Sequence, residues 1–415
     1  MPNETFDIEL TAMANGGSAL GRHGKKTIFI PYTIPGEHVT ARITEDKGRI
    51  AFAEGITLVE ASADRVYPRC PHFGPNRCGR CQWQHIDYTA QVLLKQDVLV
   101  DQLSRIGGLD DSTLSSAMRE IIPSPVEWHY NHHMTFETSP EGQIGLPSSD
   151  GRSLALIEEC HILHPALFAL YSSLDMNFSG LTHLKLQIGS DGEMMLILSV
   201  NKEEDAPEIH IDLPISVNLL LEDDEPINLI GETHLRYTVG GHQFRVTGGS
   251  EFRSNIAALE KLAEVVVEAL ALKPNQAVLD LYAGVGFFSA FIADKVRLLT
   301  LVESYPPAAT DADSNLADFD HIDLIEGRVE DVLFTLDTTY DAVIVDPPAQ
   351  GLSVEAVDAL AAKGIPRLVY VSSDAATLAR DAARLVKQGY TLESVQPLDL
   401  APQTYYVDAV AVFIR

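Results

Sequence analysis

Hydrophobic and polar residues alternate in short runs over the first sixty or so positions, which is typical of β-strands. Residues 6–10, 27–30 and 38–43 follow this alternation. Gly16-Gly17 and Pro35-Gly36-Glu37 mark turns between the runs. About five short strands in so small a segment predict a small β-barrel of the oligonucleotide-binding kind.

The pattern changes twice in the middle of the chain. Residues 88–105 are expected to form a helix, whereas residues 120–245 are mostly strand and turn signals. Residues 253–272 are predicted to be helical again, because apolar residues recur at helical spacing. This apolar face consists of Ile256, Leu259, Leu262, Val266 and Leu270.

After Pro274 the chain alternates between apolar strands and amphipathic helices. Strands are predicted at residues 277–282, 298–303, 341–346, 367–372 and 407–414. This rhythm predicts a doubly wound, largely parallel, Rossmann-like sheet. The expected fold class is therefore α/β plus β, with the barrel at residues 1–62, a central, mostly β domain at 63–250 and the Rossmann-like domain at 251–415.

Composition limits the class of protein. The chain has 415 residues, of which 46% are hydrophobic, enough to bury the cores of two or three domains. It contains no run of eighteen apolar residues, so we expect no membrane association. The polar N-terminus has no signal-peptide pattern. We therefore expect a cytoplasmic monomer.

The net charge of −29 argues against indiscriminate binding of nucleic acid, because phosphate contacts need Lys and Arg. The charge is uneven. Residues 1–105 hold 12 basic and 12 acidic residues, so residues 106–415 carry the whole excess. If RNA binds, the N-terminal quarter is the better place for its phosphates. An equally good interpretation of the charge alone is solubility, including in salty cytoplasm.

The four cysteines suggest a metal site. Cys70, Cys78 and Cys81 are close in sequence, and Cys160 lies far away. A single Cys-x-x-Cys pair does not match a zinc ribbon, which usually has two such pairs. Four thiolates from a loop and a distant segment can hold a [4Fe–4S] cluster. The spacing alone leaves three alternatives: a cluster, a zinc ion, or four unrelated thiols.

A second candidate site follows the first predicted strand of the C-terminal sheet. Asp280 and Tyr282 lead into Gly284 and Gly286, where the backbone can approach a ligand closely at a helix N-terminus. Glu303 ends the next strand, where an acid can bind ribose hydroxyls. The missing third glycine favours adenosylmethionine over NAD. A tight structural turn is the simpler alternative.

A third strand of this sheet ends in Asp346-Pro347-Pro348. Strand ends of a doubly wound sheet line the ligand crevice, so this carboxylate is expected to form a rigid rim beside the cofactor. The alternative is an ordinary turn at the end of a strand.

These residues together resemble the RNA uracil-C5 methyltransferases of transfer and ribosomal RNA, over nearly the whole chain. Residues 1–60 look like the family's TRAM domain, including Gly16-Gly17 and Ile34-Pro35-Gly36-Glu37. The stretch Cys78–Tyr88, with Gln91 and Lys95, is similar to its cluster motif, and Cys160 with Pro165 to its fourth ligand region.

The resemblance has several implications for cofactors and ligands. It implies a class I fold that uses S-adenosylmethionine, and an RNA substrate. It also implies a [4Fe–4S] cluster on Cys70, Cys78, Cys81 and Cys160, as in the ribosomal-RNA branch. The cofactor-binding positions would be Arg253, Asp280, Tyr282, Gly284, Gly286, Glu303 and Asp346.

The family's reaction proceeds through a covalent intermediate. A cysteine adds to carbon 6 of a flipped-out uracil, carbon 5 accepts the methyl group, and a carboxylate removes the carbon-5 proton. The family's Tyr-x-Ser-Cys-Asn-Pro stretch corresponds here to Tyr370–Ala375, which puts Ser373 in the cysteine position. Its Pro-x-Thr-x-His-Val-Glu stretch corresponds to Pro402–Asp408, so Asp408 replaces the base and Tyr406 a histidine.

Two further departures surround the cofactor. Ala349 follows Pro348 where the family has arginine, and Arg253 stands where the family's Phe-Gln-x-Asn has glutamine. A serine hydroxyl needs a dedicated base to attack, and residues 366–380 contain no histidine. Three hypotheses follow: an RNA methyltransferase with altered activity, an inactive member that binds RNA and adenosylmethionine as a chaperone or scaffold, and a small-molecule methyltransferase.

Overall fold

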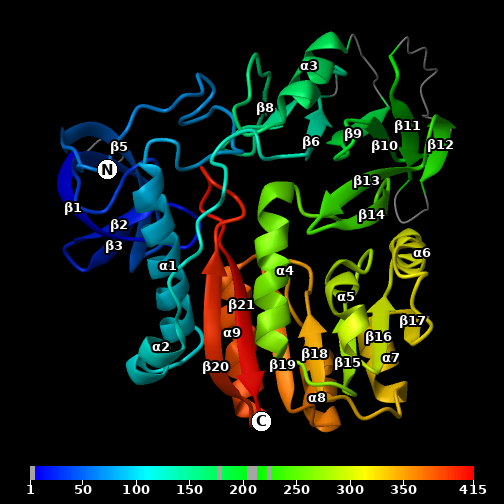
Figure 1. The fold of residues 1–415 in the computed structure, drawn as a ribbon. Coiled ribbons are helices and arrows are strands. Elements are labelled where there is room, and N and C mark those ends of the chain that lie inside the picture. The colour runs from blue at the N-terminus through cyan, green and yellow to red at the C-terminus, as the bar shows by residue number, and fades with distance from the viewer. Residues whose placement is uncertain (1–4, 140, 175–179, 203–212, 222–225) are drawn as a thin grey trace.

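The computed structural model describes residues 5–139, 141–174, 180–202, 213–221 and 226–415 (Figure 1). Parts of the predicted blocks 1–62 and 63–250, including residues 1–4, lie outside the described residues. A barrel, a second sheet and a large C-terminal α/β unit follow one another along the chain, and α1 runs beside the C-terminal unit.

The N-terminal strands close into a barrel in the order β1-β2-β3-β5-β4, as the alternation predicted. Its strands are β1 (Thr5–Met13), β2 (Ala19–His23), β3 (Lys26–Ile30), β4 (His38–Asp46) and β5 (Ile50–Glu60). Trp83 comes from outside the barrel, is fully buried in its core, and donates its indole N–H to Gly17 O at 3.1 Å. The cysteine-bearing segment is therefore anchored to the barrel.

The middle of the chain builds a sheet in the order β12-β11-β10-β9-β6-β7-β8. Its strands are β6 (His133–Thr138), β7 (Ile144–Pro147), β8 (Leu154–Ala155), β9 (Leu181–Ile188), β10 (Met194–Val200), β11 (Ser216–Leu220) and β12 (Ile227–Ile230). Helix α3 (Pro165–Ser173) covers its core. A separate hairpin, β13 (His234–Val239) with β14 (His242–Thr247), leads to the C-terminal unit.

The C-terminal sheet has the order β17-β16-β15-β18-β19-β21-β20. Its strands are β15 (Ala277–Leu281), β16 (Leu298–Glu303), β17 (Ile322–Glu326), β18 (Ala342–Val345), β19 (Arg367–Ser372), β20 (Thr391–Leu398) and β21 (Asp408–Ile414). All neighbours are parallel except the pairs that β21 makes. The order reverses between β15 and β18, so the ligand crevice of such a sheet is expected there.

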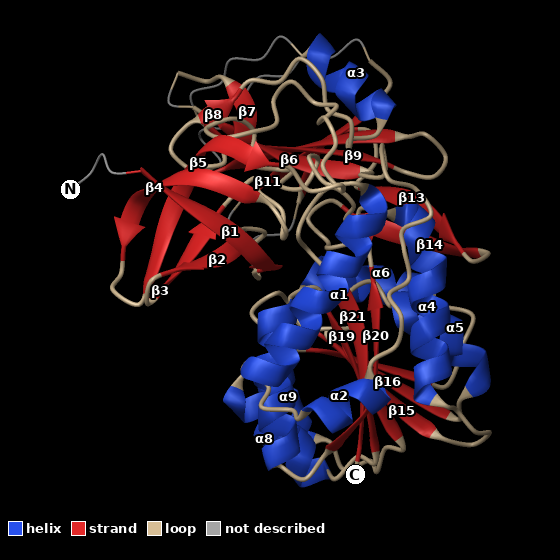
Figure 2. Ribbon diagram, turned by 90° about the vertical axis from the view of Figure 1, so that its left-hand side faces the viewer, coloured by secondary structure: helices blue, strands red, loops and turns tan. Residues whose placement is uncertain are grey.

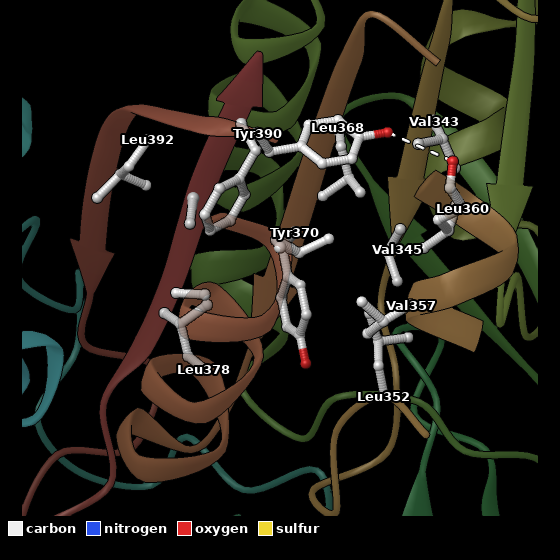
Figure 3. Close-up of a cluster of buried hydrophobic side chains, with 14 of the residues drawn as sticks. Val343, Val345, Leu352, Val357, Leu360, Leu368, Tyr370, Leu378, Tyr390 and Leu392 are labelled. Atoms are coloured by element: carbon white, nitrogen blue, oxygen red, sulfur yellow. Dashed lines mark hydrogen bonds between the residues drawn. The ribbon is translucent and has the colours of Figure 1, made fainter. Parts of the chain in front are cut away.

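Helices cover both faces of this sheet (Figure 2). One face is covered by α1 (Tyr88–Arg105), α2 (Asp111–Ala117), α8 (Val354–Lys363) and α9 (Ala375–Lys387). The other is covered by α4 (Ile256–Leu270), α5 (Phe287–Ile292) and α6 (Pro306–Asn315). Short α7 (Val329–Val332) lies before β18. Figure 3 shows the first core, where Tyr370 and Tyr390 pack among aliphatic side chains.

Two expectations differ from the structure. The helix predicted at 253–272 begins only at Ile256 and ends at Leu270, so Arg253 and Ser254 belong to an irregular segment. Strands β17 and β20 were not predicted, because their polar and partly exposed residues weaken the hydrophobic signal. The five strands that were predicted are present, with bounds that differ by at most one residue.

Helix α1 has the predicted bounds, and it packs on the C-terminal unit. On its buried face, Lys95 Nζ donates to Asp399 Oδ1 at 2.6 Å, and neither side chain has exposed surface. Gln91 exchanges two hydrogen bonds with Gln403, at 3.0 and 2.9 Å. The packing thus crosses position 250, and the division into blocks at residues 62 and 250 stays a prediction.

No helix among the described residues has the length and hydropathy needed to span a bilayer.

We expect Lys95→Met to lower the free energy of unfolding by about 3–5 kcal/mol, because it leaves the Asp399 carboxylate buried without its cation. Denaturant unfolding followed by tryptophan fluorescence measures this loss. The double variant Lys95→Met/Asp399→Leu should recover much of it. Arg105→Met, which removes an exposed ion pair of the same helix with Asp101, should leave the unfolding midpoint unchanged. Equal effects of Lys95→Met and Arg105→Met would contradict the assignment.

Candidate active site

The glycine turn after β15 adopts the conformation that close approach of a ligand requires. Gly284 and Gly286 have φ of 55° and 78°. A Cβ at Gly286 would lie 3.1 Å from Leu316 Cδ1, a tight contact that adds to the preference of its positive φ for glycine. A Cβ at Gly284 would meet open space. Gly284 is therefore not forced by packing, and the open space beside it leaves room for a ligand.

Two acids flank this turn. Glu303, at the end of β16, accepts the backbone N–H of Gly284 at 2.8 Å. Asp280 is buried in β15, where its Oδ2 accepts the Ser289 hydroxyl at 2.6 Å and its Oδ1 has no hydrogen-bond partner among the described residues. Burial raises the pKa of Asp280 to about 7, although the Ser289 hydrogen bond lowers it. An unsatisfied buried acceptor beside a glycine turn fits a polar ligand that donates to it.

Tyr282 lies between these residues with φ of 59°, and its hydroxyl is 3.5 Å from Glu330 Oε1. The left-handed conformation is uncommon for a tyrosine, so the turn that carries Gly284 is held by its surroundings. The predicted cofactor residues therefore lie together at the adjacent carboxyl ends of β15 and β16.

Arg253 and Asp346 form the central charged pair of the site. The guanidinium Nη1 and Nη2 donate to Asp346 Oδ2 and Oδ1 at 2.8 and 2.7 Å, a bidentate geometry. The guanidinium carbon also lies 5.9 Å from the centre of the Phe288 ring. Both oxygens of the carboxylate that ends β18 are thus engaged by this arginine.

The central sheet holds the segment that carries Arg253. His133 Nε2 donates to Phe252 O at 2.7 Å, and the backbone N–H of His132 donates to Ser254 O at 3.0 Å. Ser254 donates its hydroxyl to Asn131 Oδ1 at 2.6 Å. Burial lowers the pKa of His133 to about 3, so it is a neutral donor. The start of β6 therefore fixes the residues on both sides of Arg253.

Ser373 and Asp408 are the positions just beyond the last pair of the antiparallel β19–β21 ladder. Ser372 pairs with Ala409 in the β19–β21 register, so the next positions on the two strands are Ser373 and Asp408. Asp408 is 6% exposed. Burial raises its pKa to about 7, although Arg253 and Lys95 lower it. A carboxyl group with that pKa can exchange a proton near neutral pH.

Ser373 has a different environment. Its side chain is exposed, and among the described residues it makes no side-chain hydrogen bond. Asp374, the next residue, uses its carboxylate to cap α9 through Thr377 N–H at 2.7 Å. No side chain among the described residues is hydrogen-bonded to the hydroxyl at the nucleophile position, so no base is in contact with it to activate the serine.

The loop between β20 and β21 is held from several sides. Gln82 and Trp83 donate their backbone N–H groups to Gln403 O at 3.1 and 3.0 Å. Tyr130 donates its hydroxyl to Pro402 O at 2.8 Å. Asn255 donates to Leu400 O at 2.9 Å. These contacts, with those of α1, fix the loop that ends at Asp408.

All four cysteines line one pocket, together with Glu159 and His161. Burial raises the pKa of Cys70, Cys78, Cys81 and Cys160, and neighbouring thiolates raise it further for Cys70, Cys81 and Cys160. In the described part of the chain, no three His, Cys, Asp or Glu side chains are arranged to hold a single metal ion. The structure thus gathers the predicted ligands, whereas the presence of a metal group stays a prediction.

Sequence reasoning missed several residues that organise the site. Gln91 and Lys95 were assigned to the cluster motif, but they lie on α1 and contact the loop before Asp408. His133, Tyr130 and Asn255 also hold site segments from a distance along the chain. Only the helical spacing of Gln91 and Lys95 gave a signal that the two side chains share a face.

Comparisons with known proteins agree with this architecture. Residues 1–56 match the TRAM domain family, and residues 256–368 match the methyltransferase small domain family. An uncharacterized RNA methyltransferase of Streptomyces avermitilis is 31% identical, over 99% of this chain and 98% of that protein. The 23S rRNA (uracil(1939)-C(5))-methyltransferase RlmD of Shewanella sediminis is 29% identical, over 98% of this chain and 95% of that protein.

Among solved structures, the Pyrococcus abyssi tRNA (uracil-54, C5)-methyltransferase in complex with S-adenosyl-L-homocysteine has a TM-score of 0.73. Its sequence is 20% identical, and the match covers 99% of this chain and 100% of the Pyrococcus abyssi chain. That likeness shows a shared fold, and the sequence relatives extend over nearly the full length. The chain therefore belongs to the TRAM-domain RNA methyltransferase family that includes the uracil-C5 methyltransferases.

Proposed function

We propose that this chain binds S-adenosylmethionine and transfers its methyl group to RNA by a route that forms no covalent adduct at residue 373. One observation carries the proposal: the base position is a buried carboxyl group, whereas the nucleophile position is an exposed serine without an activating partner among the described residues. In the family's reaction, carbon 5 of uracil becomes nucleophilic through such an adduct. The methyl acceptor would then be an RNA nitrogen or oxygen with its own lone pair.

The residues around the glycine turn suit the cofactor. Gly284 offers open space, Glu303 can accept ribose hydroxyls, and Asp280 Oδ1 lacks a partner within the described residues. Bound S-adenosylmethionine supplies an electrophilic methyl group. The RNA substrate is supported by the family and by what the two named relatives act on, ribosomal RNA and transfer RNA.

Asp408 would act as the general base. When the acceptor atom attacks, its proton must leave, and the Asp408 carboxylate is the nearby group that can take it. The Arg253 guanidinium, which pairs with Asp346, also lowers the pKa of Asp408 and so favours the ionised form of Asp408. Removing such a base typically lowers the rate by about 10²- to 10⁴-fold.

A second candidate is an inactive member that binds RNA as a chaperone or scaffold. The Arg253–Asp346 pair favours it, because both oxygens of a carboxylate on the cofactor side already have a partner. A carboxylate occupied in this way is less available to a substrate.

Transfer of labelled methyl from S-adenosylmethionine to unmodified ribosomal and transfer RNA separates these functions. We expect the native chain and Ser373→Ala to label RNA equally, because Ser373 takes no part, and Asp408→Asn to be slower by about 10²- to 10⁴-fold. Digestion and mass spectrometry of the product would identify the methylated atom. Labelling by Ser373→Cys alone would favour the inactive member, and loss of activity in Ser373→Ala would show that the serine is used.

The pH dependence of stability provides a test of Asp408 that needs no activity. The ordinary pKa of an aspartate is 3.8, so between about pH 4 and 7 the unfolded chain binds fewer protons at this group than the folded chain. Its contribution to stability is therefore full below about pH 4 and is lost as the pH rises to about 7. Asp408→Asn should make this decline in unfolding midpoint smaller, and the part that Asp280 contributes should remain, because its pKa is also raised to about 7.

Asp294→Asn is the matched control, because Asp294 is exposed on the surface. It should leave the pH profile of the native chain unchanged. A decline between about pH 4 and 7 that is identical in Asp408→Asn and the native chain would show that Asp408 ionises normally. The transfer rate, in contrast, should rise with pH up to about 7, because the base must be ionised.

We further propose that the four cysteines hold a [4Fe–4S] cluster. The donor set is what supports this proposal: four thiols line one pocket, and four cysteine thiolates are the usual ligands of such a cluster. The raised pKa values keep these sulfurs protonated until bound iron compensates for burial. The cluster would tie the cysteine segment to the central sheet.

Anaerobic purification followed by iron and acid-labile sulfide analysis tests this. We expect both in the native chain and in Glu159→Gln, whose side chain lines the pocket without a thiol, and little of either in Cys160→Ser. Zinc without sulfide would establish the zinc alternative. Neither iron nor zinc in a folded, anaerobically purified chain would mean that the four residues are free thiols.

A further inference from the structure

Two tyrosine rings pack against each other in a tilted arrangement on the loop that ends at Asp408. The ring centroids of Tyr405 and Tyr406 are 4.4 Å apart, with planes inclined by 33°, and the hydroxyls are 3.3 Å apart. Tyr406 is 46% exposed, and Tyr405 lies behind it, partly buried. An exposed ring supported from behind by a second ring presents a flat apolar face to solvent.

The barrel supports the inner ring. A Cβ at Gly17 would be 2.9 Å from Tyr405 Cδ1, so the ring fits against a glycine of the β1–β2 turn. The same turn accepts the Trp83 indole N–H. Gly17 has φ of 84°, which also favours glycine. Tyr405 therefore packs between the barrel and the C-terminal unit, whereas the neighbouring Tyr406 remains exposed to solvent.

The backbone under the pair is rigid. Gln403, two residues earlier, is 2% exposed and bound by Gln82, Trp83 and Gln91. Tyr406 N–H donates to Thr404 Oγ1 at 3.3 Å. A ring on such a loop loses little conformational entropy when it binds a flat ligand.

The pair also lies beside the reacting positions. Asp374, which follows Ser373, is close enough to raise the pKa of Tyr405, after the larger effects of burial and of Tyr406. Asp408 follows Tyr406 by two residues and is buried. Two carboxylates, the partly buried Asp374 and the buried Asp408, are therefore near the tyrosines. The pair also belongs to residues 106–415, which hold the whole excess of negative charge.

A negatively charged surface cannot hold RNA through its phosphates, but an aromatic ring can hold a base by stacking, which needs no cation. We propose that Tyr406, backed by Tyr405, is the stacking surface for an unpaired base of the RNA substrate. The inference rests on the proposed function, since the base is placed beside the site of methyl transfer. Phosphate contacts would fall to the neutral N-terminal quarter, where Arg22 near the end of β2 and Lys25 in the β2–β3 turn are both exposed.

Binding of a fluorescently labelled RNA hairpin with an all-uridine loop tests the proposal, compared with the same stem carrying abasic nucleotides in the loop. We expect Tyr406→Ala to weaken binding of the uridine hairpin by about 5- to 150-fold, the range for loss of one stacked base. Tyr406→Phe should bind like the native chain, because stacking needs the ring and not the hydroxyl. Binding of the abasic hairpin should be the same for all three proteins.

Two further variants complete the experiment. Phe334→Ala removes another exposed aromatic, from the segment before β18, and should not alter binding. Arg22→Ala/Lys25→Ala should reduce the salt dependence of binding, whereas Tyr406→Ala should leave it unchanged. Equal unfolding midpoints of Tyr406→Ala and the native chain establish that the variant is folded.

The proposal is overturned if Tyr406→Ala binds the uridine hairpin as the native chain does, or if it loses affinity equally for the abasic hairpin. It is also overturned if the native chain binds neither hairpin. These outcomes are separate from the proposed function, which is measured as methyl transfer. A chain that stacks a base and transfers no methyl group would retain this inference and lose the methyltransferase proposal.

Discussion

A lysine with no exposed surface, Lys95, faces an aspartate with none, Asp399, across the junction between α1 and the last loop of the C-terminal sheet. Burial by itself lowers the pKa of Lys95, and the Asp399 carboxylate counteracts it. Neither charge can remain buried without the other. The pair therefore requires α1 to dock, and docking brings Gln91 to Gln403 and the cysteine segment to the same loop. The loop that ends at Asp408 has its shape because these contacts form together.

The contacts that hold the site segments also determine where its charges lie. The irregular segment before α4 lets Arg253 reach Asp346, and the start of β6 holds that segment through His133 and Asn131. The family has a neutral glutamine at position 253 and an arginine after the two prolines, where this chain has Ala349. In this chain the arginine that contacts the Asp346 carboxylate is therefore residue 253, and no arginine follows the two prolines. Asp408 faces this charge from the end of β21, which connects the two departures from the family pattern.

RNA recognition by so acidic a chain needs a division of tasks. Phosphates carry charge and require cations, whereas bases have neutral faces and can stack. The neutral first quarter of the sequence contains the barrel, the cysteine segment and α1, and the inner tyrosine of the pair contacts the barrel at Gly17. The two kinds of contact would therefore meet at one junction. The cysteine pocket is linked to the same loop through Gln82, Trp83 and Tyr130.

Local pattern determined much of the fold. Alternation gave the barrel, helical spacing gave α1, and apolar runs gave five strands of the C-terminal sheet, because these signals depend only on neighbours in the sequence. The glycine turn, the four cysteines and the two altered reacting positions could also be recognised as motifs.

The sequence did not predict the start of α4 or the edge strands β17 and β20. It also did not predict the roles of four side chains: Gln91, Lys95, His133 and Tyr405. Each of these depends on a partner far away in the sequence or on partial exposure at a sheet edge. Only the tertiary structure decides which distant polar groups meet, because burial makes their pairing obligatory and no local periodicity records it.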